Sequence, residues 1–276
     1  MIKPFWNAKE EWLLIRLIAT DLDGTLLEPD GKLPEGTFAM VRMLVDMGIH
    51  FAASSGRESS NLMRLFGPVA DQMAFVCLNG ALNFVDGQLA GCVPIPEKTA
   101  REIIRDVDAL GMNLLISGRH TCYMVDACRK YTDDIVYRLR NTVTIISHPD
   151  EITEPILKIS GQIDCGVADL APGLLEKWGS RVTATVSGRD WFDFTAANKG
   201  MGVEMLMKHM GLVRDEVMVF GDNFNDESMF GVVDYPFLME HANPALRKPG
   251  IRLCKKVLPV LEALIAANGD PQKAFN

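Results

Sequence analysis

One short stretch near the amino terminus constrains what the rest of the chain can form. Residues 17–20 are β-compatible and run directly into Asp21, Asp23 and Gly24, where glycine permits a sharp turn. In open α/β sheets, ligands bind at the carboxyl ends of the parallel strands, so both carboxylates would lie at that edge. Asp21 and Asp23 stand two residues apart, which lets them face the same side of an extended backbone. The stretch therefore predicts a strand that delivers two carboxylates to a binding edge.

Two simpler interpretations compete with a catalytic one. Asp-Gly is a common turn signal, and a turn needs no function. Asp-x-Asp also opens a calcium-binding EF-hand loop, which requires glycine at its sixth position and glutamate at its twelfth. Counting from Asp21 places Leu26 and Lys32 at those positions, which excludes the calcium loop. The plain turn and the catalytic pair both stay open on this stretch alone.

Composition restricts the class of protein. The 276 residues are 48% hydrophobic and carry a formal net charge of -8 without a basic block, which supports a real core and argues against a nucleic-acid partner. No uncharged apolar run reaches the length of a membrane span, and the apolar piece at residues 12–15 is too short for a signal peptide. We therefore expect a cytoplasmic protein without a membrane partner, in which residues 1–15 form an extra arm or helical turn.

Several common site types are missing from the sequence. The six cysteines and five histidines lack the spacings of zinc or redox sites, so reduced structural thiols are expected. The glycine patterns of P-loop and dinucleotide-binding proteins and the Gly-x-Ser-x-Gly pattern of serine hydrolases are also absent. These absences remove the usual nucleotide-binding and serine-hydrolase interpretations.

The order of predicted elements indicates a parallel sheet interrupted by a second unit. Strand-like and helix-like segments alternate up to residue 81, which is typical of a parallel sheet with crossover helices. A hairpin-rich block follows over 82–190, beginning with a hairpin that turns at Asp86-Gly87. The alternation resumes over 191–276. We therefore expect an α/β fold with a catalytic core formed by 1–81 and 191–276, and an inserted α+β domain at 82–190.

Polar groups of distinct chemistry stand at four element ends in the predicted core. The ends of parallel strands meet at one edge of a sheet, so these groups would converge. This combination fits phosphoryl transfer, in which catalysis is mainly positioning and charge neutralisation. The groups are Asp21 with Asp23, Ser55 with Gly56, Lys199, and Asp222 with Asp226.

Each residue type suits one part of that chemistry. Asp21 would attack phosphorus and become an aspartyl phosphate, while Asp23 would protonate the leaving oxygen and then activate water. Ser55, with the flexible backbone at Gly56, would hydrogen-bond the phosphoryl oxygens, and Lys199 would supply a point charge. Taken singly, a serine in Ser-Ser-Gly is usually a turn residue and a lysine in Asn-Lys-Gly usually a surface residue. Their joint occurrence favours a site.

A divalent cation would complete this set. The carboxylates of Asp21 and Asp222, with the backbone carbonyl of Asp23, offer hard oxygen ligands at few enough positions to suit Mg²⁺ with its retained waters. The predicted cofactor is therefore Mg²⁺.

The same four segments resemble the motifs of a known family. Asp-Leu-Asp-Gly-Thr-Leu, Ser-Ser-Gly-Arg, Asn-Lys-Gly and Gly-Asp-Asn-Phe-Asn-Asp are similar, in this order, to motifs of the haloacid dehalogenase superfamily. The insert stands where the Cof-type phosphatases of that superfamily carry an α+β cap, so the resemblance covers nearly the whole chain. It implies a Rossmann-like core, Mg²⁺, an aspartyl-phosphate intermediate and hydrolysis of small phosphorylated metabolites. It also implies that Asn225 contacts phosphate and that Asp226 supports the site.

A few positions depart from that pattern or remain open. Glu240 and His241 replace the glycine and asparagine usual in a loop at the substrate entrance, so a substrate is not carried over from the resemblance. Asn79-Gly80 stands where substrate often meets the core, and Gly118-Arg119 could contact a second anionic group. Both dipeptides also suit plain turns.

The residues together favour a Mg²⁺-dependent phosphatase that acts on a small phosphate monoester, such as a sugar phosphate or a related metabolite. We expect the inserted domain to open and close over the site on linkers near 80–82 and 190–197. Two alternatives stay open: a phosphosugar mutase with a related core and cap, and a non-catalytic regulator that binds a phosphometabolite. The sequence predicts no oligomeric state.

Overall fold

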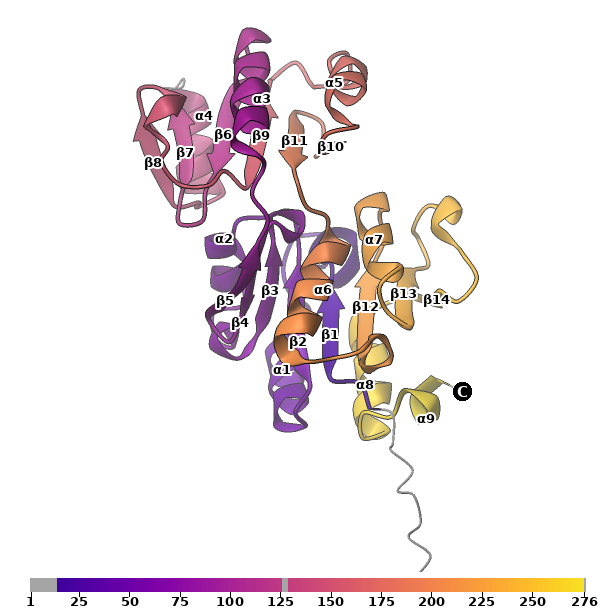
Figure 1. Cartoon of the computed structure of the whole chain (residues 1–276). Helices are drawn as coiled ribbons and strands as arrows, with labels where there is room; N and C mark the ends of the chain where they lie inside the picture. Colours follow the sequence, from indigo (N-terminus) through magenta and orange to yellow (C-terminus); the bar gives the residue numbers. More distant parts are fainter. Residues whose placement is uncertain (1–13, 126–128, 276) are drawn as a thin grey trace, which may run out of the picture.

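A computed structural model describes residues 14–125 and 129–275, so most of the arm expected over residues 1–15 lies outside the described residues. The chain forms a larger unit and a smaller unit, which two connecting segments join (Figure 1). The first of these segments links a strand of the larger unit to a helix of the smaller one, and the second returns the chain to the larger unit.

The larger unit is built on one mixed sheet. Its strands are β1 (Leu17–Thr20), β2 (His50–Ser54), β3 (Ala74–Cys77), β4 (Leu82–Val85), β5 (Gln88–Cys92), β12 (Val217–Gly221), β13 (Tyr235–Met239) and β14 (Arg252–Cys254). Within the described residues they lie in the order β14-β13-β12-β1-β2-β3-β4-β5. Neighbours from β14 to β3 pair in parallel, whereas β4 pairs antiparallel with β3 and β5. The predicted parallel-sheet core is therefore present.

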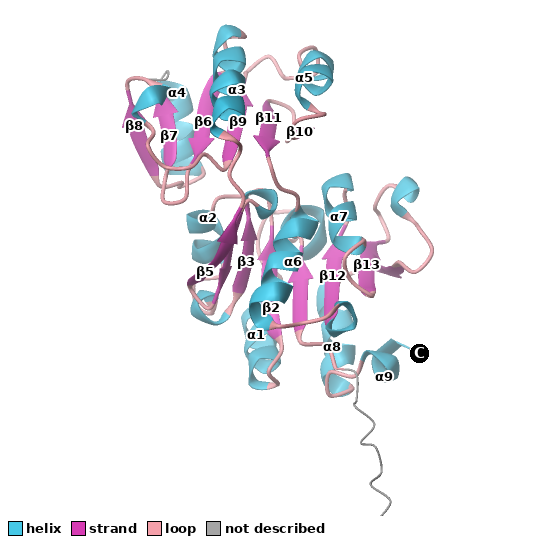
Figure 2. Cartoon of the chain, in the orientation of Figure 1, coloured by secondary structure: helices cyan, strands magenta, loops and turns pink. Residues whose placement is uncertain are grey.

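Helices cover both faces of this sheet (Figure 2). They are α1 (Thr37–Asp46), α2 (Ser59–Leu65), α6 (Lys199–Met210), α7 (Glu227–Phe230), α8 (Val257–Ala266) and α9 (Pro271–Phe275). Because side chains alternate along a strand, Ile18 of β1 packs with α1, α2 and α8, whereas Leu17 and Ala19 pack with α6 and α7 on the other face. The apolar run of β1 is thus buried on both faces, as expected for a central parallel strand.

The smaller unit has a sheet of its own. Its strands are β6 (Asn113–Ser117), β7 (Cys122–Val125), β8 (Val143–Ile146), β9 (Lys158–Gln162), β10 (Thr183–Val186) and β11 (Trp191–Thr195), and its helices are α3 (Glu97–Ala109), α4 (Arg129–Asp133) and α5 (Ala171–Trp178). Within the described residues the strands lie in the order β10-β11-β9-β6-β7-β8. Ile159, Phe192 and Phe194 pack beneath α3 and α5. The alternate residues of β9 and β11 therefore point to the opposite face, toward the larger unit.

Sheet membership differs from the expected division at both ends of the insert. The hairpin of β4 and β5 pairs with β3 and extends the larger sheet, although residues 82–92 were assigned to the insert. Strand β11 pairs with β9 and β10 in the smaller sheet, although residues 191–195 were assigned to the core. A turn signal predicts a hairpin but carries no information on which sheet edge it joins. We propose that the insert is bounded by the linkers 93–96 and 196–198.

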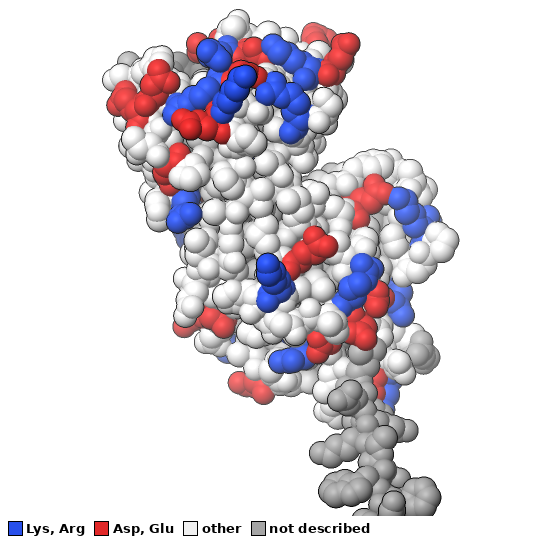
Figure 3. Space-filling model, viewed as in Figure 1, with Lys and Arg blue, Asp and Glu red and all other residues white. Residues whose placement is uncertain are grey.

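The surface of the two units differs in charge on the face that Figure 3 shows. Charged side chains gather over the smaller unit around α3, whereas the region between the two units is mostly uncharged on this face (Figure 3). Among the described residues, no helix combines the length and the apolar character that crossing a membrane requires.

Candidate active site

The ends of β1, β2 and β12 bring the predicted site residues to the edge that faces the smaller unit. Asp21 follows β1, Ser55 follows β2, Asp222 follows β12, and Lys199 is the first residue of α6. These strands are direct neighbours in the order β12-β1-β2, which explains why their ends converge. Asp21, Asp23, Ser55, Gly56, Lys199 and Asn225 all line one cleft of about 870 Å³ between the two units.

Lys199 is a buried cation at the centre of the site. Its side chain is 1% exposed, and its Nζ donates to Asp21 Oδ1 at 2.5 Å and to Asp226 Oδ1 at 2.6 Å. Burial works against the ammonium, yet the two carboxylates raise the pKa of Lys199 above its usual value. Burial also raises the pKa of Asp21 to about 7, although Lys199 opposes that shift. One ammonium therefore serves two buried carboxylates.

Asp226 supports the loop that follows β12. Its Oδ2 accepts hydrogen bonds from the backbone N–H groups of Asp222 at 2.9 Å and Asn223 at 3.0 Å. Because Oδ1 accepts from Lys199, both oxygens of this fully buried carboxylate are engaged by the protein. A Cβ on Gly221 would lie 2.4 Å from the Asp226 Cβ, so glycine is required for this approach.

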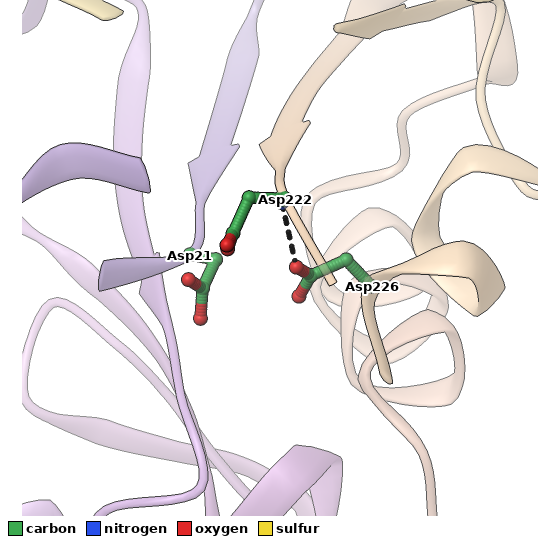
Figure 4. A group of neighbouring side chains, drawn as sticks. All are labelled: Asp21, Asp222 and Asp226. Carbon is green, nitrogen blue, oxygen red and sulfur yellow. Dashed lines mark hydrogen bonds between the residues drawn. The ribbon is translucent and has the colours of Figure 1, made fainter. Parts of the chain in front are cut away.

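Three carboxylates form a cluster that could hold a cation. Asp21, Asp222 and Asp226 each offer an oxygen within 4.8 Å of the others. Figure 4 shows the side chains of Asp21 and Asp222 close together beyond the adjacent ends of β1 and β12, with Asp226 beside them. Asp222 Oδ1 accepts from Thr25 at 3.0 Å, and burial raises the pKa of the Asp222 carboxyl. Since Asp226 is fully engaged, Asp21 and Asp222 are the residues that would bind the ion. Their hard oxygens fit Mg²⁺.

Asp23 stands apart from this cluster. Arg57 holds its carboxylate in a two-point contact, from Nη2 to Oδ1 at 2.6 Å and from Nε to Oδ2 at 3.1 Å. The side chain of Asp23 therefore does not join the three carboxylates, and the predicted metal contact at this position is its backbone carbonyl. Arg57 is a site residue that the sequence does not predict, although its position directly after Ser55-Gly56 is a signal that could have indicated it.

The segment after β2 is closely packed against the end of β3. A Cβ on Gly56 would lie 3.2 Å from Asn79 Nδ2, so glycine lets the asparagine side chain approach. Asn79 has a left-handed φ of 54° and lines the cleft, and its buried Oδ1 accepts no hydrogen bond from any residue that the structure describes. Ser55 is buried beside it, and its Oγ accepts from the Arg57 N–H at 3.3 Å.

Two positions that the sequence leaves open, His241 and Gly118-Arg119, differ in their relation to the site. His241 Nε2 lies 3.9 Å from Asp222 Oδ2, so the altered loop reaches the acidic cluster. Arg119 is not among the described residues that line the cleft, and its backbone N–H donates to Glu154 at 2.8 Å. The suggested contact of Gly118-Arg119 with an anionic substrate group therefore has no support from the geometry.

The structure is thus an α/β protein whose carboxylate-rich site lies in a cleft between a parallel-sheet unit and an inserted unit. The profile of the haloacid dehalogenase-like hydrolases matches residues 18–250, and the chain belongs to this family. The match confirms the resemblance drawn from the motifs, and with it the prediction of an enzyme of the phosphatase class.

Particular relatives agree with this assignment. The HMP-PP phosphatase of Escherichia coli (strain 55989 / EAEC) is 26% identical over 245 residues, which cover 85% of this chain and 87% of the relative. A haloacid dehalogenase-like hydrolase from Bacteroides thetaiotaomicron has a TM-score of 0.76 at 17% identity, covering 91% of this chain and 99% of its own. The subclass IIB sugar phosphatase BT4131 has a TM-score of 0.74 at 18% identity, covering 91% and 98%. The two structures confirm the predicted fold.

Proposed function

We propose that this protein is a Mg²⁺-dependent phosphatase that hydrolyses small phosphate monoesters through an aspartyl phosphate on Asp21. The observation that carries the proposal is the buried ammonium of Lys199 against Asp21, at strand ends that line a cleft. A preorganised cation beside a carboxylate lowers the electrostatic cost of bringing a phosphate dianion to that nucleophile. The names of an HMP-PP phosphatase and a sugar phosphatase among similar proteins support a small phosphorylated metabolite, such as a sugar phosphate, as substrate.

The reaction proceeds in two displacements. An oxygen of Asp21 attacks phosphorus, the bond to the leaving oxygen breaks, and Asp23 gives its proton to that oxygen. Water then attacks the phosphorus of the aspartyl phosphate while Asp23 takes its proton, and the bond to Asp21 breaks to release inorganic phosphate. Ser55, the backbone at Gly56 and Asn225 bind the phosphoryl oxygens. Lys199 neutralises charge on Asp21 and on the phosphoryl group.

Asp23 has to exchange partners during this cycle. It bonds to Arg57 in this structure, and the leaving oxygen would lie above Asp21 in the cleft. Asp23 is exposed, so its side chain is free to rotate toward a bound substrate without repacking the core. Arg57 lines the same cleft and holds the Asp23 side chain beside the reacting group until substrate binds.

The acidic cluster supports the proposal of Mg²⁺. Asp21, Asp222 and the backbone carbonyl of Asp23 would hold the ion, and Asp226 would position the loop that carries Asp222. A bound Mg²⁺ supplies positive charge to the transferring phosphoryl group and orients it. We also propose a cytoplasmic location, since the described cysteines Cys77, Cys92, Cys122, Cys165 and Cys254 are free thiols.

Release of inorganic phosphate from p-nitrophenyl phosphate tests the proposed function. We expect turnover with Mg²⁺ and a loss of at least about a hundredfold after chelation with EDTA, restored by added Mg²⁺. A phosphosugar mutase would convert a hexose 1-phosphate into its 6-phosphate without free phosphate. A regulator would bind phosphorylated compounds without turning over either substrate. Either of those results would overturn the phosphatase.

A further inference from the structure

We propose that the smaller sheet carries a subsite for the leaving group, in which Ser160 and Asp193 together bind one hydroxyl of the substrate. The inference rests on the proposed phosphatase function and deepens it, because it names what part of the substrate the insert recognises. It arises from two neighbouring strands, β9 and β11, whose inner face closes the cleft opposite the catalytic edge.

The strand register places these residues in one row. Ser160 of β9 lies opposite Asp193 of β11, with Leu115 of β6 on the far side of Ser160 and Thr185 of β10 on the far side of Asp193. Residues directly opposite one another on antiparallel strands share a face of the sheet. All four line the cleft that also contains Asp21, while α3 and α5 occupy the other face of the sheet (Figure 1). The row therefore faces the cleft in which a phosphoryl group would react with Asp21.

Two polar atoms in this row have no hydrogen-bond donor or acceptor among the described residues. Ser160 is 1% exposed, and its Oγ has no partner in that part of the chain. Asp193 is 3% exposed, and its Oδ2 accepts from Lys158 Nζ at 3.4 Å, while no described residue donates to its Oδ1. Buried polar atoms are nearly always hydrogen-bonded, so a missing partner beside a cleft points to a bound molecule.

The charge of the subsite argues for an uncharged ligand group. Lys158 is buried, and its ammonium donates to Asp193 and to the backbone carbonyl of Gly56 at 3.0 Å. The carboxylate and the ammonium neutralise one another, so a charged ligand group would be buried here without a counter-charge. The leaving group therefore presents an uncharged polar atom to the row.

The hydrogen-bonding capacity of the two residues narrows this further. A carboxylate oxygen only accepts, whereas a serine hydroxyl both donates and accepts. A ligand atom that donates to Asp193 and accepts from Ser160 has to do both, and a hydroxyl oxygen does. An ether or carbonyl oxygen only accepts, and an ammonium only donates.

The wall beside the row suits a ring that carries such a hydroxyl. Trp191 stands two residues before Asp193 on β11, so it shares that face, and its side chain lines the cleft. Its ring packs against that of Tyr131, with the two ring centroids 6.0 Å apart. A sugar or cyclitol ring presents an apolar face of C–H groups and an edge of hydroxyls. We therefore assign the subsite to a cyclic polyol whose phosphate reaches Asp21.

A substrate and variant cycle tests this subsite. Hexose and pentose phosphates are first compared by phosphate release, and the best substrate is paired with its monodeoxy analogues. With the wild type, we expect loss of one particular hydroxyl to lower kcat/KM by about tenfold to a hundredfold, because the site is left with unpaired polar groups. Ser160→Ala should cause a loss of similar size with the hydroxylated substrate and almost none with that deoxy analogue. In Ser160→Ala, the ratio of kcat/KM for the hydroxylated substrate to kcat/KM for the deoxy analogue should therefore be close to one.

Two further measurements separate recognition from a structural role. Since no described residue hydrogen-bonds to the Ser160 Oγ, Ser160→Ala should melt at or above the temperature of the wild type in the absence of substrate. Ser147→Ala, an exposed serine of the same unit, should keep the full hydroxyl preference. Ser160→Thr keeps the hydroxyl and should retain part of that preference.

The outcomes are distinct. If the loss of kcat/KM caused by Ser160→Ala is the same with the hydroxylated substrate and with every deoxy analogue, the proposed subsite is wrong. The proposed phosphatase function is not affected by that result. The subsite would also be overturned by a wild type that hydrolyses p-nitrophenyl phosphate yet shows no preference for hydroxylated phosphates, or by a marked loss of stability in Ser160→Ala. A wild type that releases phosphate from no substrate would overturn the proposed function itself.

Discussion

At the scale of single residues, the site contains more buried carboxylates than buried ammonium groups. One ammonium, that of Lys199, lies between Asp21 and Asp226, and Asp222 stands beside them. Burial raises the pKa of Asp21 although a lysine touches it, and the nearby carboxylate of Asp226 adds to the rise. The excess of negative charge explains why a divalent cation would be attracted to this place. A phosphatase needs this state: a nucleophile held ready, with charge that an incoming cation and phosphate complete.

The first prediction concerns the nucleophile. Asp21→Asn keeps the volume of the side chain and removes the attacking oxyanion, so phosphate release should fall by about a thousandfold or more. Single-turnover measurements give the loss of phosphate release, and circular dichroism shows that the variant keeps its fold. Activity close to that of the wild type, in a variant with native circular dichroism, would exclude the covalent mechanism on Asp21.

A second prediction follows from the raised pKa of the same carboxyl. The pKa of Asp21 is about 7 in the metal-free folded protein and near 3.8 when unfolded, so ionising it opposes folding. This cost is absent below about pH 4, grows as the pH rises, and is complete above about pH 7. In EDTA at pH 8, Asp21→Asn should therefore be more stable than the wild type, by on the order of 1–4 kcal/mol. The difference should shrink toward pH 4 in urea titrations. A variant that is less stable at pH 8 would contradict it.

At the scale of elements, the turn after β1 is fixed by a glycine. Gly24 has a φ of +88°, and a Cβ there would lie 2.4 Å from Asp222 Oδ2. The turn thus has two requirements, a left-handed backbone and room for the carboxylate that follows β12. Its residues bind the two central strands of the sheet into one site, because Thr25 also donates to Asp222.

The third prediction separates these two requirements. Gly24→Ala should lower kcat/KM by about a hundredfold and the free energy of unfolding by about 1–3 kcal/mol, because the methyl group displaces Asp222. Gly31→Ala is the matched control, since Gly31 has a φ of +78° with nothing within 4 Å of the added Cβ. It should lose stability through backbone strain and keep its activity. Equal activity in the two variants would show that the approach to Asp222 does not matter.

The sequence predicted which strand ends carry the site residues better than it predicted the contacts between residues of different elements. Strand ends with Asp21, Ser55 and Asp222 were recognisable because each apolar run stops at polar residues, and the sheet order brings them together. The pairing of Arg57 with Asp23 was missed, because it joins loops after two different strands and neither loop shows a pattern alone. The row of Ser160 and Asp193 could not be predicted for the same reason, because the two residues become neighbours only through the register of β9 and β11.

For the whole molecule, the contacts between the two units are concentrated on one core segment. Asn61 and Arg64 of α2 donate to the carbonyls of Leu139 and Arg140, at 2.9–3.2 Å. Ser117 of β6 donates to Glu58 at the start of α2. These core residues directly follow the Ser55 loop, so movement of the smaller unit acts on the segment that would bind phosphate. Closure of the smaller unit over the cleft would therefore be coupled to the loop that we propose binds phosphate.

The last prediction tests this coupling with a double variant, Asn61→Ala with Arg64→Ala. It removes three hydrogen bonds to Leu139 and Arg140, each modest because the groups are partly exposed. Together they should weaken the closed arrangement by about 1.4 kcal/mol, which is about tenfold in its population relative to the open one. Because substrate binding then has to pay for closure, KM should rise by up to about tenfold, with a smaller change in kcat.

Small-angle scattering of the free double variant should show a larger radius of gyration than the wild type, because more molecules are open. Arg42→Ala is the matched control, since Arg42 also donates to a backbone carbonyl, that of Pro68, but within the larger unit. It should change neither KM nor the scattering. If the double variant also leaves both unchanged, these contacts do not hold the units together, and closure depends on other contacts between them, such as those of Ser117 with Glu58 and of Lys158 with the Gly56 carbonyl.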